Sequence, residues 1–226
     1  MITHLFFDAG NTLVYPNLGL VAEKLAGRGA TVKTGDLDAA EQKTRYELDD
    51  PDLVRTSNDD ARWNLYFRTI FRYSGVTDAL IVEAVLEELR TIHRTNNLWE
   101  IVPPEVPAAL ESLKGRYRLS VISNANGTVR EKLRRVGLLG YFDMVIDSAE
   151  EGVEKPDPRI FHAAVQRTGA RIEQSLYIGD MYHIDVTGAR AAGMDVVLLD
   201  PAGLHHDKPV RRIAGLGALA SSIDAP

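Results

Sequence analysis

The chain has 226 residues and a formal net charge of −6; 45% of its residues are hydrophobic and 26% are charged. These shares are typical of a globular protein, and the length suits one α/β domain or a core with an inserted unit. The acidic balance argues against nucleic-acid or anionic-membrane partners, which need a dense field of Lys and Arg. Because the chain has no cysteine, disulfides, thiolate catalysis and cysteine-based metal sites are excluded.

The chain begins without the basic segment, apolar stretch and cleavage site of a signal peptide. No run approaches the ~20 apolar residues of a membrane span. We therefore expect a cytoplasmic protein with no membrane partner and no nucleic-acid partner. The sequence leaves the oligomeric state open.

The first element is a short apolar run, Ile2 to Phe7, followed by the turn formers Ala9 and Gly10. This pattern predicts a strand buried on both faces. Asp8 falls just past its end, and ligands of open α/β sheets bind at such strand ends. A carboxylate there either caps a turn or helix, the commoner fate of a lone Asp, or takes part in chemistry.

The next block predicts about four helices, because apolar residues recur at helical spacing between breaks rich in Gly, Pro and Asp. The predicted helices span Leu18 to Leu25, Leu37 to Leu48, Trp63 to Phe71 and Ala79 to Ile92. Asn58, with two acids after it, is expected to cap the third helix rather than to bind metal. Trp99 to Pro107 closes this block, with Pro103-Pro104 expected to be the return linker.

From Pro107 onward helices and strands alternate, which predicts a parallel sheet covered by helices. The predicted strands are Leu119 to Ile122, Met144 to Asp147, Leu176 to Ile178 and Val196 to Leu199, and the predicted helices are Pro107 to Lys114, Thr128 to Val136, Arg159 to Thr168 and Ile184 to Ala192. In the tail, His205 and His206 are expected to be solvated loop residues. Gly215 to Gly217 is expected to end a helix.

Polar motifs follow these predicted strands in a fixed order. After Asp8 and Thr12 the chain carries Ser123-Asn124, then Lys155-Pro156-Asp157-Pro158, then Ile178-Gly179-Asp180 with Asp185. Each motif alone is weak, but the ordered set resembles the haloacid dehalogenase-like hydrolase superfamily over nearly the whole chain. The resemblance implies a Rossmann-like α/β core of residues 1–15 and 100–226, with helices on both faces of a parallel sheet, and an inserted α-helical cap at about 16–99.

The resemblance also implies a reaction: Mg²⁺-dependent hydrolysis of a small phosphorylated metabolite through an aspartyl phosphate at Asp8. A divalent cation offsets the repulsion between a carboxylate nucleophile and a phosphoryl group, and Mg²⁺ suits oxygen ligands. By this resemblance Asp8, Asp180 and the backbone carbonyl of Gly10 bind the metal. Asp185 acts nearby, through a metal-bound water or by holding Lys155.

The same resemblance assigns the phosphate-binding residues. Ser123 and the amide of Asn124 would donate to phosphoryl oxygens, and Lys155 would supply a compact positive charge. Thr12 would orient the loop that carries the nucleophile. Without the resemblance, Ser123 fits a turn residue and Lys155 a surface charge.

The chain departs from the superfamily's pattern at Gly10, where phosphatases usually carry a second Asp that acts as general acid and base. Glycine can do neither, and His183 and His93 are candidate substitutes. The departure favours two alternatives: a 2-haloacid dehalogenase, whose halide leaves without a proton, and a phosphonate-cleaving enzyme, which has a small residue at this position. A non-catalytic metal- or phosphate-binding protein is a further alternative. The dehalogenases lack the acids that this chain carries at Asp180 and Asp185. A phosphonate-cleaving enzyme would need a Schiff-base lysine in the cap, and no cap lysine stands in a recognisable setting.

Overall fold

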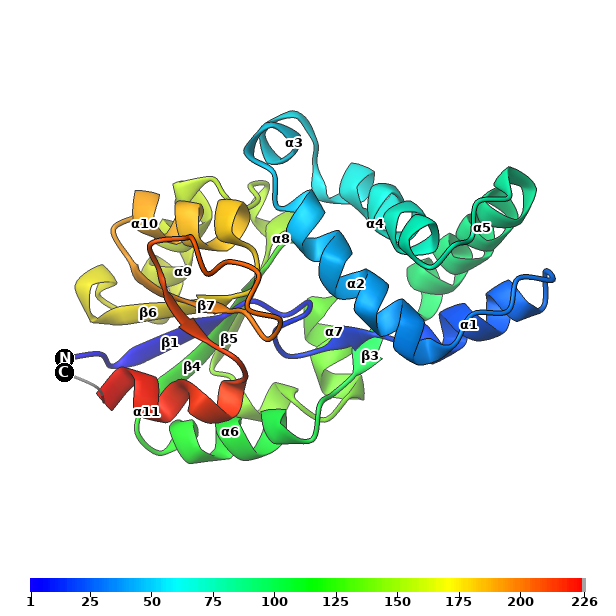
Figure 1. Cartoon of the computed structure of the whole chain (residues 1–226). Coiled ribbons are helices and arrows are strands. Elements are labelled where there is room, and N and C mark those ends of the chain that lie inside the picture. Colours follow the sequence, from blue (N-terminus) through cyan, green and yellow to red (C-terminus); the bar gives the residue numbers. More distant parts are fainter. Residues whose placement is uncertain (225–226) are drawn as a thin grey trace. The chain divides into compact units, whose positions relative to one another are not determined.

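A computed structural model describes residues 1–224 of the chain and shows an α/β protein (Figure 1). The chain forms two compact units. The core unit consists of Met1–Tyr15 and Ile101–Pro226, and the helical unit consists of Pro16–Glu100. None of the helices formed by residues 1–224 has the length and apolar character needed to cross a bilayer.

The core unit is built on a six-stranded parallel sheet with the order β5-β4-β1-β6-β7-β8. β1 is therefore an interior strand with β4 and β6 as neighbours. Phe7, its last residue, stands opposite Val121 and Ile178. The strands are β1 (His4–Phe7), β4 (Arg118–Ser123), β5 (Met144–Asp147), β6 (Ser175–Gly179), β7 (Asp195–Leu199) and β8 (Arg211–Ile213).

Helices cover both faces of this sheet: Figure 1 shows α9 and α10 on one face and α6 and α11 on the other. This arrangement confirms the predicted Rossmann-like α/β fold. The core-unit helices are α6 (Glu105–Lys114), α7 (Val129–Arg135), α8 (Ser148–Glu151), α9 (Pro158–Thr168), α10 (Thr187–Ala191) and α11 (Leu219–Asp224), with short 3₁₀ turns at Leu139–Tyr141, Ile172–Gln174 and Leu216–Ala218.

The helical unit packs five helices around an apolar core that includes Trp63, Phe67 and Phe71. The helices are α1 (Leu18–Ala26), α2 (Thr34–Leu48), α3 (Pro51–Thr56), α4 (Asp59–Tyr73) and α5 (Ala79–Asn96). Where the chain leaves and re-enters the core unit, it forms the two-stranded sheet of β2 (Tyr15–Pro16) and β3 (Trp99–Ile101). That this unit acts as a cap domain stays a prediction.

The prediction of about four helices here missed α3. The Asp50-Pro51 pair was expected to be a break, but Asp50 accepts hydrogen bonds from the backbone N–H groups of Asp52 and Leu53 and begins a new helix. Proline is favoured in the first turn of a helix, so the same residues that stop one helix start the next. The expected cap at Asn58 is confirmed, because its side chain accepts from the N–H of Ala61.

The predictions for the tail were partly wrong. β8 was not expected, and Gly215 precedes a 3₁₀ turn rather than ending a helix. His205 is buried, with 6% exposure, where a solvated residue was expected. Its backbone N–H donates to Asp200, which also accepts from Arg212 in β8. The polar contacts of Asp200, which the hydrophobic pattern does not contain, accompany this burial.

The segment after β6 also differs from its prediction. A helix over Ile184 to Ala192 was expected, but Tyr182–Val186 forms a π-helical turn before α10 begins at Thr187. A π turn makes room for a side chain that an α-helical turn would crowd, and such turns are frequent at functional sites.

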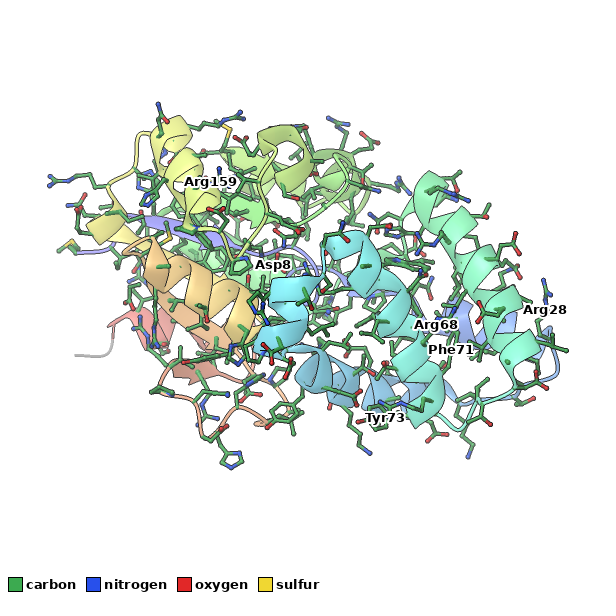
Figure 2. All side chains as sticks on the ribbon, turned by 90° about the horizontal axis from the view of Figure 1, so that it is seen from above. Asp8, Arg28, Arg68, Phe71, Tyr73 and Arg159 are labelled. Carbon is green, nitrogen blue, oxygen red and sulfur yellow. The ribbon has the colours of Figure 1, made fainter. Side chains whose placement is uncertain are left out.

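Two residues of α4, Phe71 and Arg68, allow the contribution of core packing to the stability of the helical unit to be compared with that of a surface ion pair (Figure 2). Phe71 is fully buried, whereas Arg68 forms an exposed ion pair with Glu83. We expect Phe71→Ala to lower the free energy of unfolding by about 3–5 kcal/mol, because it leaves a cavity. Arg68→Ala is expected to cost less than about 1 kcal/mol, because solvent screens the pair.

Urea unfolding followed by tryptophan fluorescence measures both variants. The chain's two tryptophans, Trp63 and Trp99, both lie in the helical unit, so the signal reports on that unit. Equal losses in the two variants would contradict the claim that apolar packing dominates its stability.

Candidate active site

Asp8 stands at the carboxyl end of the interior strand β1 (Figure 2). Its backbone N–H continues the ladder by donating to the carbonyl of Ile178 at 2.8 Å, and the residue is buried, with 7% exposure. The chain then turns back sharply, because the carbonyl of Ala9 accepts from the N–H groups of Leu13 and Val14 at 2.9 and 3.0 Å. The carboxylate is thus fixed between a strand and a tight loop.

Lys155 reaches Asp8 from the loop that precedes α9. Its Nζ donates to Asp8 Oδ1, Asp185 Oδ1 and Tyr177 Oη, each at 2.7 Å. An ammonium group has three N–H donors, so all three are used. Lys155 is only 2% exposed, and two carboxylates and a phenol therefore replace the water that its charge would otherwise attract.

The backbone of Lys155 is held by a second polar contact. The side chain of Asn124, which directly follows β4, accepts from the Lys155 N–H at 2.7 Å and donates to the Lys155 carbonyl at 2.9 Å. One amide side chain satisfies both backbone groups, which fixes the loop before α9 against the end of β4. The predicted role for the Asn124 backbone amide stays a prediction.

Asp185 is surrounded by four donors. Its Oδ1 accepts from Lys155 and from Tyr177, the latter at 3.0 Å, and its Oδ2 accepts from the N–H groups of Asp180 and Met181 at 3.0 Å each. Of the two roles expected for this residue, these contacts favour holding Lys155. Asp185 also fixes the loop that carries Asp180.

Two glycines make the close packing around Asp185 and Lys155 possible. A Cβ on Gly179 would lie 2.4 Å from Asp185 Cγ. A Cβ on Gly188 would lie 2.8 Å from Phe161 Cε2 and 2.9 Å from the carbonyl oxygen of Pro156, the residue after Lys155. Real Cβ atoms do not approach neighbours so closely, so both positions need glycine for space rather than for backbone freedom.

Ser123 is the last residue of β4 and is 3% exposed. The loop after it is held from the end of β5 and the start of α8: Ser148 Oγ accepts from the N–H of Ala125 at 3.0 Å, and Asp147 accepts from the N–H groups of Gly127 and Val129 at 3.0 and 3.3 Å. The segment that follows Ser123 is thereby held in place.

Thr12 lies in the tight loop after Asp8 and is 1% exposed. Within residues 1–224 its Oγ1 has no hydrogen-bond partner. A buried hydroxyl without a partner costs free energy unless a ligand or water satisfies it. This supports the predicted role of Thr12 near the nucleophile without testing it.

The electrostatics of the site centre on one cation among three acids. Burial alone would lower the pKa of Lys155, but the charges of Asp185 and Asp8 and their hydrogen bonds raise it above its ordinary value, so the amine stays charged. Burial raises the pKa of Asp8, against the lowering effect of Lys155. Asp180, also 7% exposed, adds a third carboxylate at the end of the adjacent strand β6, which leaves an excess of negative charge that a divalent cation would offset.

The predicted metal ligands fit Mg²⁺ by donor chemistry, because carboxylate and carbonyl oxygens are the ligands it prefers. Asp8 follows β1, and Asp180 follows the adjacent strand β6. Within residues 1–224 no group of three His, Cys, Asp or Glu side chains is arranged to hold a metal. A set of two carboxylates and the Gly10 carbonyl does not require such a group. The ligand set, Asp185 included, stays a prediction.

The two histidines considered as acid or base lie in different settings. His93 belongs to the helical unit, where its Nδ1 accepts from the N–H of Leu98 at 3.2 Å and its ring packs against Trp63 and Trp99. These contacts fit a structural residue. His183 lies in the π-helical turn with its ring against Tyr182.

Sequence reasoning missed Tyr177, Asp147 and Ser148. Tyr177 lies in β6 two residues before Gly179, and in a strand such residues share a face. That face carries the glycine that admits Asp185, so a tyrosine there was a usable signal for a buried hydroxyl near the site. Asp147 ends β5 as Ser123 ends β4, and the two are register partners.

The comparisons with known proteins agree with this geometry. A sequence model of haloacid dehalogenase-like hydrolases matches residues 2–193. The glyceraldehyde 3-phosphate phosphatase of Methanothermobacter thermautotrophicus is 32% identical over 205 residues, covering 88% of this chain and 86% of the relative. The crystal structure of a HAD phosphatase from Thermococcus onnurineus has a TM-score of 0.61 and 26% identity, covering 99% of this chain and 98% of the other.

A third relative, YfnB from Bacillus subtilis, was solved bound to magnesium and has a TM-score of 0.69 over 99% of both chains. Its identity of 18% supports the fold alone. Taken with the family match, these likenesses show that the chain belongs to the haloacid dehalogenase-like hydrolase family. It is a hydrolase with a helical region inserted after β1.

The contact between Gly179 and Asp185 yields a stability prediction. We expect Gly179→Ala to lower the free energy of unfolding by about 1–3 kcal/mol, because the added methyl group forces Asp185 away from its donors. Gly140→Ala is the matched control, since a Cβ there meets no atom within 4 Å. Urea unfolding followed by circular dichroism compares them. An equally stable Gly179→Ala protein would contradict the tight packing described for this loop.

Proposed function

We propose that the protein is a Mg²⁺-dependent phosphatase that hydrolyses a small phosphorylated metabolite through an aspartyl phosphate on Asp8. The observation that carries the proposal is the buried ion pair of Asp8 with Lys155, which has Asp185 as its second carboxylate. A carboxylate held beside a charged amine at a strand end has the position that a nucleophile needs. The amine has the position to bind a phosphoryl oxygen.

In the proposed reaction a carboxylate oxygen of Asp8 attacks phosphorus, and the bond from phosphorus to the leaving oxygen breaks. The leaving oxygen takes a proton from water. A second water then attacks the phosphorus of the aspartyl phosphate, releases inorganic phosphate and restores Asp8. Mg²⁺ bound by Asp8, Asp180 and the Gly10 carbonyl would offset the charge that gathers on the phosphoryl oxygens.

Lys155, Ser123 and Asn124 have complementary tasks in this scheme. Phosphoryl transfer needs positioning and charge stabilisation more than covalent help from the protein. Lys155 would exchange its bond to Asp8 for one to a phosphoryl oxygen, and Ser123 Oγ with the Asn124 N–H would bind the others. Asn124 also fixes the Lys155 backbone, so the two phosphate-binding segments act as one.

The substrate class rests on the relatives and on Gly10. The Methanothermobacter relative is named for a phosphorylated sugar, which supports a small phosphorylated metabolite here. Because Gly10 cannot protonate a leaving group, general acid help worth typically ~10²- to 10⁴-fold is missing at this position. Substrates with good leaving groups, such as acyl phosphates, should therefore be hydrolysed fastest.

Two other functions fit the fold. A 2-haloacid dehalogenase would also use Asp8 as nucleophile, but it has no need for the negative charge gathered by Asp180 and Asp185. A non-catalytic binder would have no need for a buried lysine held by two carboxylates and a phenol, since that burial is costly unless the charges are paired. Both remain outcomes of the experiment that follows.

The first functional prediction concerns Asp8 and the metal. Hydrolysis of p-nitrophenyl phosphate and of a panel of sugar, nucleotide and acyl phosphates is expected with Mg²⁺ and is expected to stop with EDTA. Asp8→Asn is expected to reduce turnover to background, because the nucleophile is lost. Asp143→Asn, an exposed acid paired with Arg118, is the matched control and should keep full activity.

Activity that survives in Asp8→Asn would overturn the assignment of the nucleophile. If no phosphate is hydrolysed, halide release from 2-chloropropionate would identify a dehalogenase. Binding of phosphate and Mg²⁺ without any turnover would identify the non-catalytic protein.

A second functional prediction concerns the missing acid. Gly10→Asp is expected to raise kcat for substrates with poor leaving groups, such as sugar phosphates, by up to about 10²-fold, because it supplies the absent proton donor. For p-nitrophenyl phosphate the gain should be smaller, since that leaving group needs no proton. Steady-state kinetics on both substrates measure this. An equal or negative effect on both would mean that another group already acts as acid.

A further inference from the structure

We propose that Tyr177 is a positioning residue of the reaction: its hydroxyl holds the ammonium of Lys155 in place while Asp8 changes its bonding. This inference rests on the proposed phosphatase function. Tyr177 would not touch the substrate, and it would act only through Lys155.

The hydroxyl of Tyr177 has three polar neighbours. It lies 2.7 Å from Lys155 Nζ, 3.0 Å from Asp185 Oδ1 and 3.2 Å from the carbonyl oxygen of Ile122. Since the ammonium can only donate, the phenol oxygen accepts from it, and the phenol proton is donated to Asp185 or to Ile122. Tyr177 thus links the lysine to the adjacent acid and to the backbone of β4.

The packing around Tyr177 restrains the position of its side chain. It is fully buried, and its ring meets that of Phe161 edge to face at a centroid distance of 5.1 Å. Its strand β6 is next to β1, yet its hydroxyl reaches past β1 to a carbonyl of β4. A rigid ring anchored at both ends restrains a lysine that would otherwise have four rotatable side-chain bonds.

The three partners of Lys155 differ in what the reaction does to them. Asp8 becomes an acyl phosphate, a mixed anhydride, when it accepts the phosphoryl group, so the charge of its carboxylate and its ion pair with Lys155 are lost in that form. Asp185 and Tyr177 keep their contacts throughout. If Asp185 alone remained, its single hydrogen bond would leave the ammonium free to swing about that bond. The hydrogen bonds to Asp185 and Tyr177 together hold the ammonium in one position. The tyrosine hydroxyl therefore keeps the Lys155 ammonium in position when Asp8 can no longer do so.

The test is Tyr177→Phe, which removes the hydroxyl and keeps the ring. We expect kcat for p-nitrophenyl phosphate to fall about 10- to 100-fold with KM changed less than about threefold, because the lost contact acts on the transition state. Ser175→Ala is the matched control: the same strand loses a buried hydroxyl that bonds to the Arg171 carbonyl, at the amino end of β6 and away from the carboxyl end that carries the site. It should keep wild-type kcat.

A Tyr177→Phe enzyme with wild-type kcat would overturn the proposal. An equal fall in kcat for Ser175→Ala would also overturn it, because the effect would then follow from general loss of stability. Both variants are compared at a temperature at which circular dichroism shows them folded.

A second measurement does not need turnover, so it separates this inference from the proposed function. Acetylation of Lys155 by a small amine reagent, followed by peptide mass spectrometry, should be faster in Tyr177→Phe and unchanged in Ser175→Ala. If the wild-type protein hydrolyses no phosphate, the proposed function fails, and this rate alone reports on the restraint. Equal rates in all three proteins would overturn the restraint of Lys155 by Tyr177.

Discussion

The structure of the core unit depends on one enclosed charge. The ammonium of Lys155 is 2% exposed and gives all three of its protons to Asp8, Asp185 and Tyr177. An unpaired charge at this depth would cost several kcal/mol, so the surrounding chain has to supply partners and hold them in place. The loop after β1, the π turn after β6 and the loop before α9 all meet at this one group.

This requirement explains several features that look unrelated along the chain. Gly179 leaves space for Asp185, Gly188 leaves space for the segment after Lys155, and Asn124 fixes the lysine backbone. The carboxyl ends of parallel strands diverge into loops, which is why a polar cluster can be buried here without breaking the sheet. In the proposed mechanism the same cluster supplies both the nucleophile and the charge that receives the phosphoryl group.

Sequence reasoning found the parts that local patterns encode. The apolar runs located the inner strands, and the resemblance of the ordered motifs to a known superfamily singled out Asp8, Ser123, Lys155 and Asp180. Tyr177 was missed because alternation counts an aromatic residue in a strand as core, whatever its hydroxyl contacts. Helix α3 was missed because Asp50-Pro51 ends one helix and begins another with the same residues. His205 is buried where its N–H donates to Asp200, which also bonds to Arg212 of β8, and hydrophobic periodicity does not contain these polar contacts.

The two ends of the helical unit are bonded to each other. The N–H of Asn17 donates to the carbonyl of Leu98 at 2.8 Å, and the Asn17 side chain donates to Glu100 at 2.7 Å. The chain therefore leaves and re-enters the core unit at neighbouring points, and the 85 residues between them form an insertion whose two ends are joined. Because its ends stay joined, such an insertion can be lengthened, shortened or replaced by another without shifting any strand of the sheet. The helical unit can therefore vary in sequence and length between related proteins while the strands that carry Asp8, Ser123 and Asp180 keep their places.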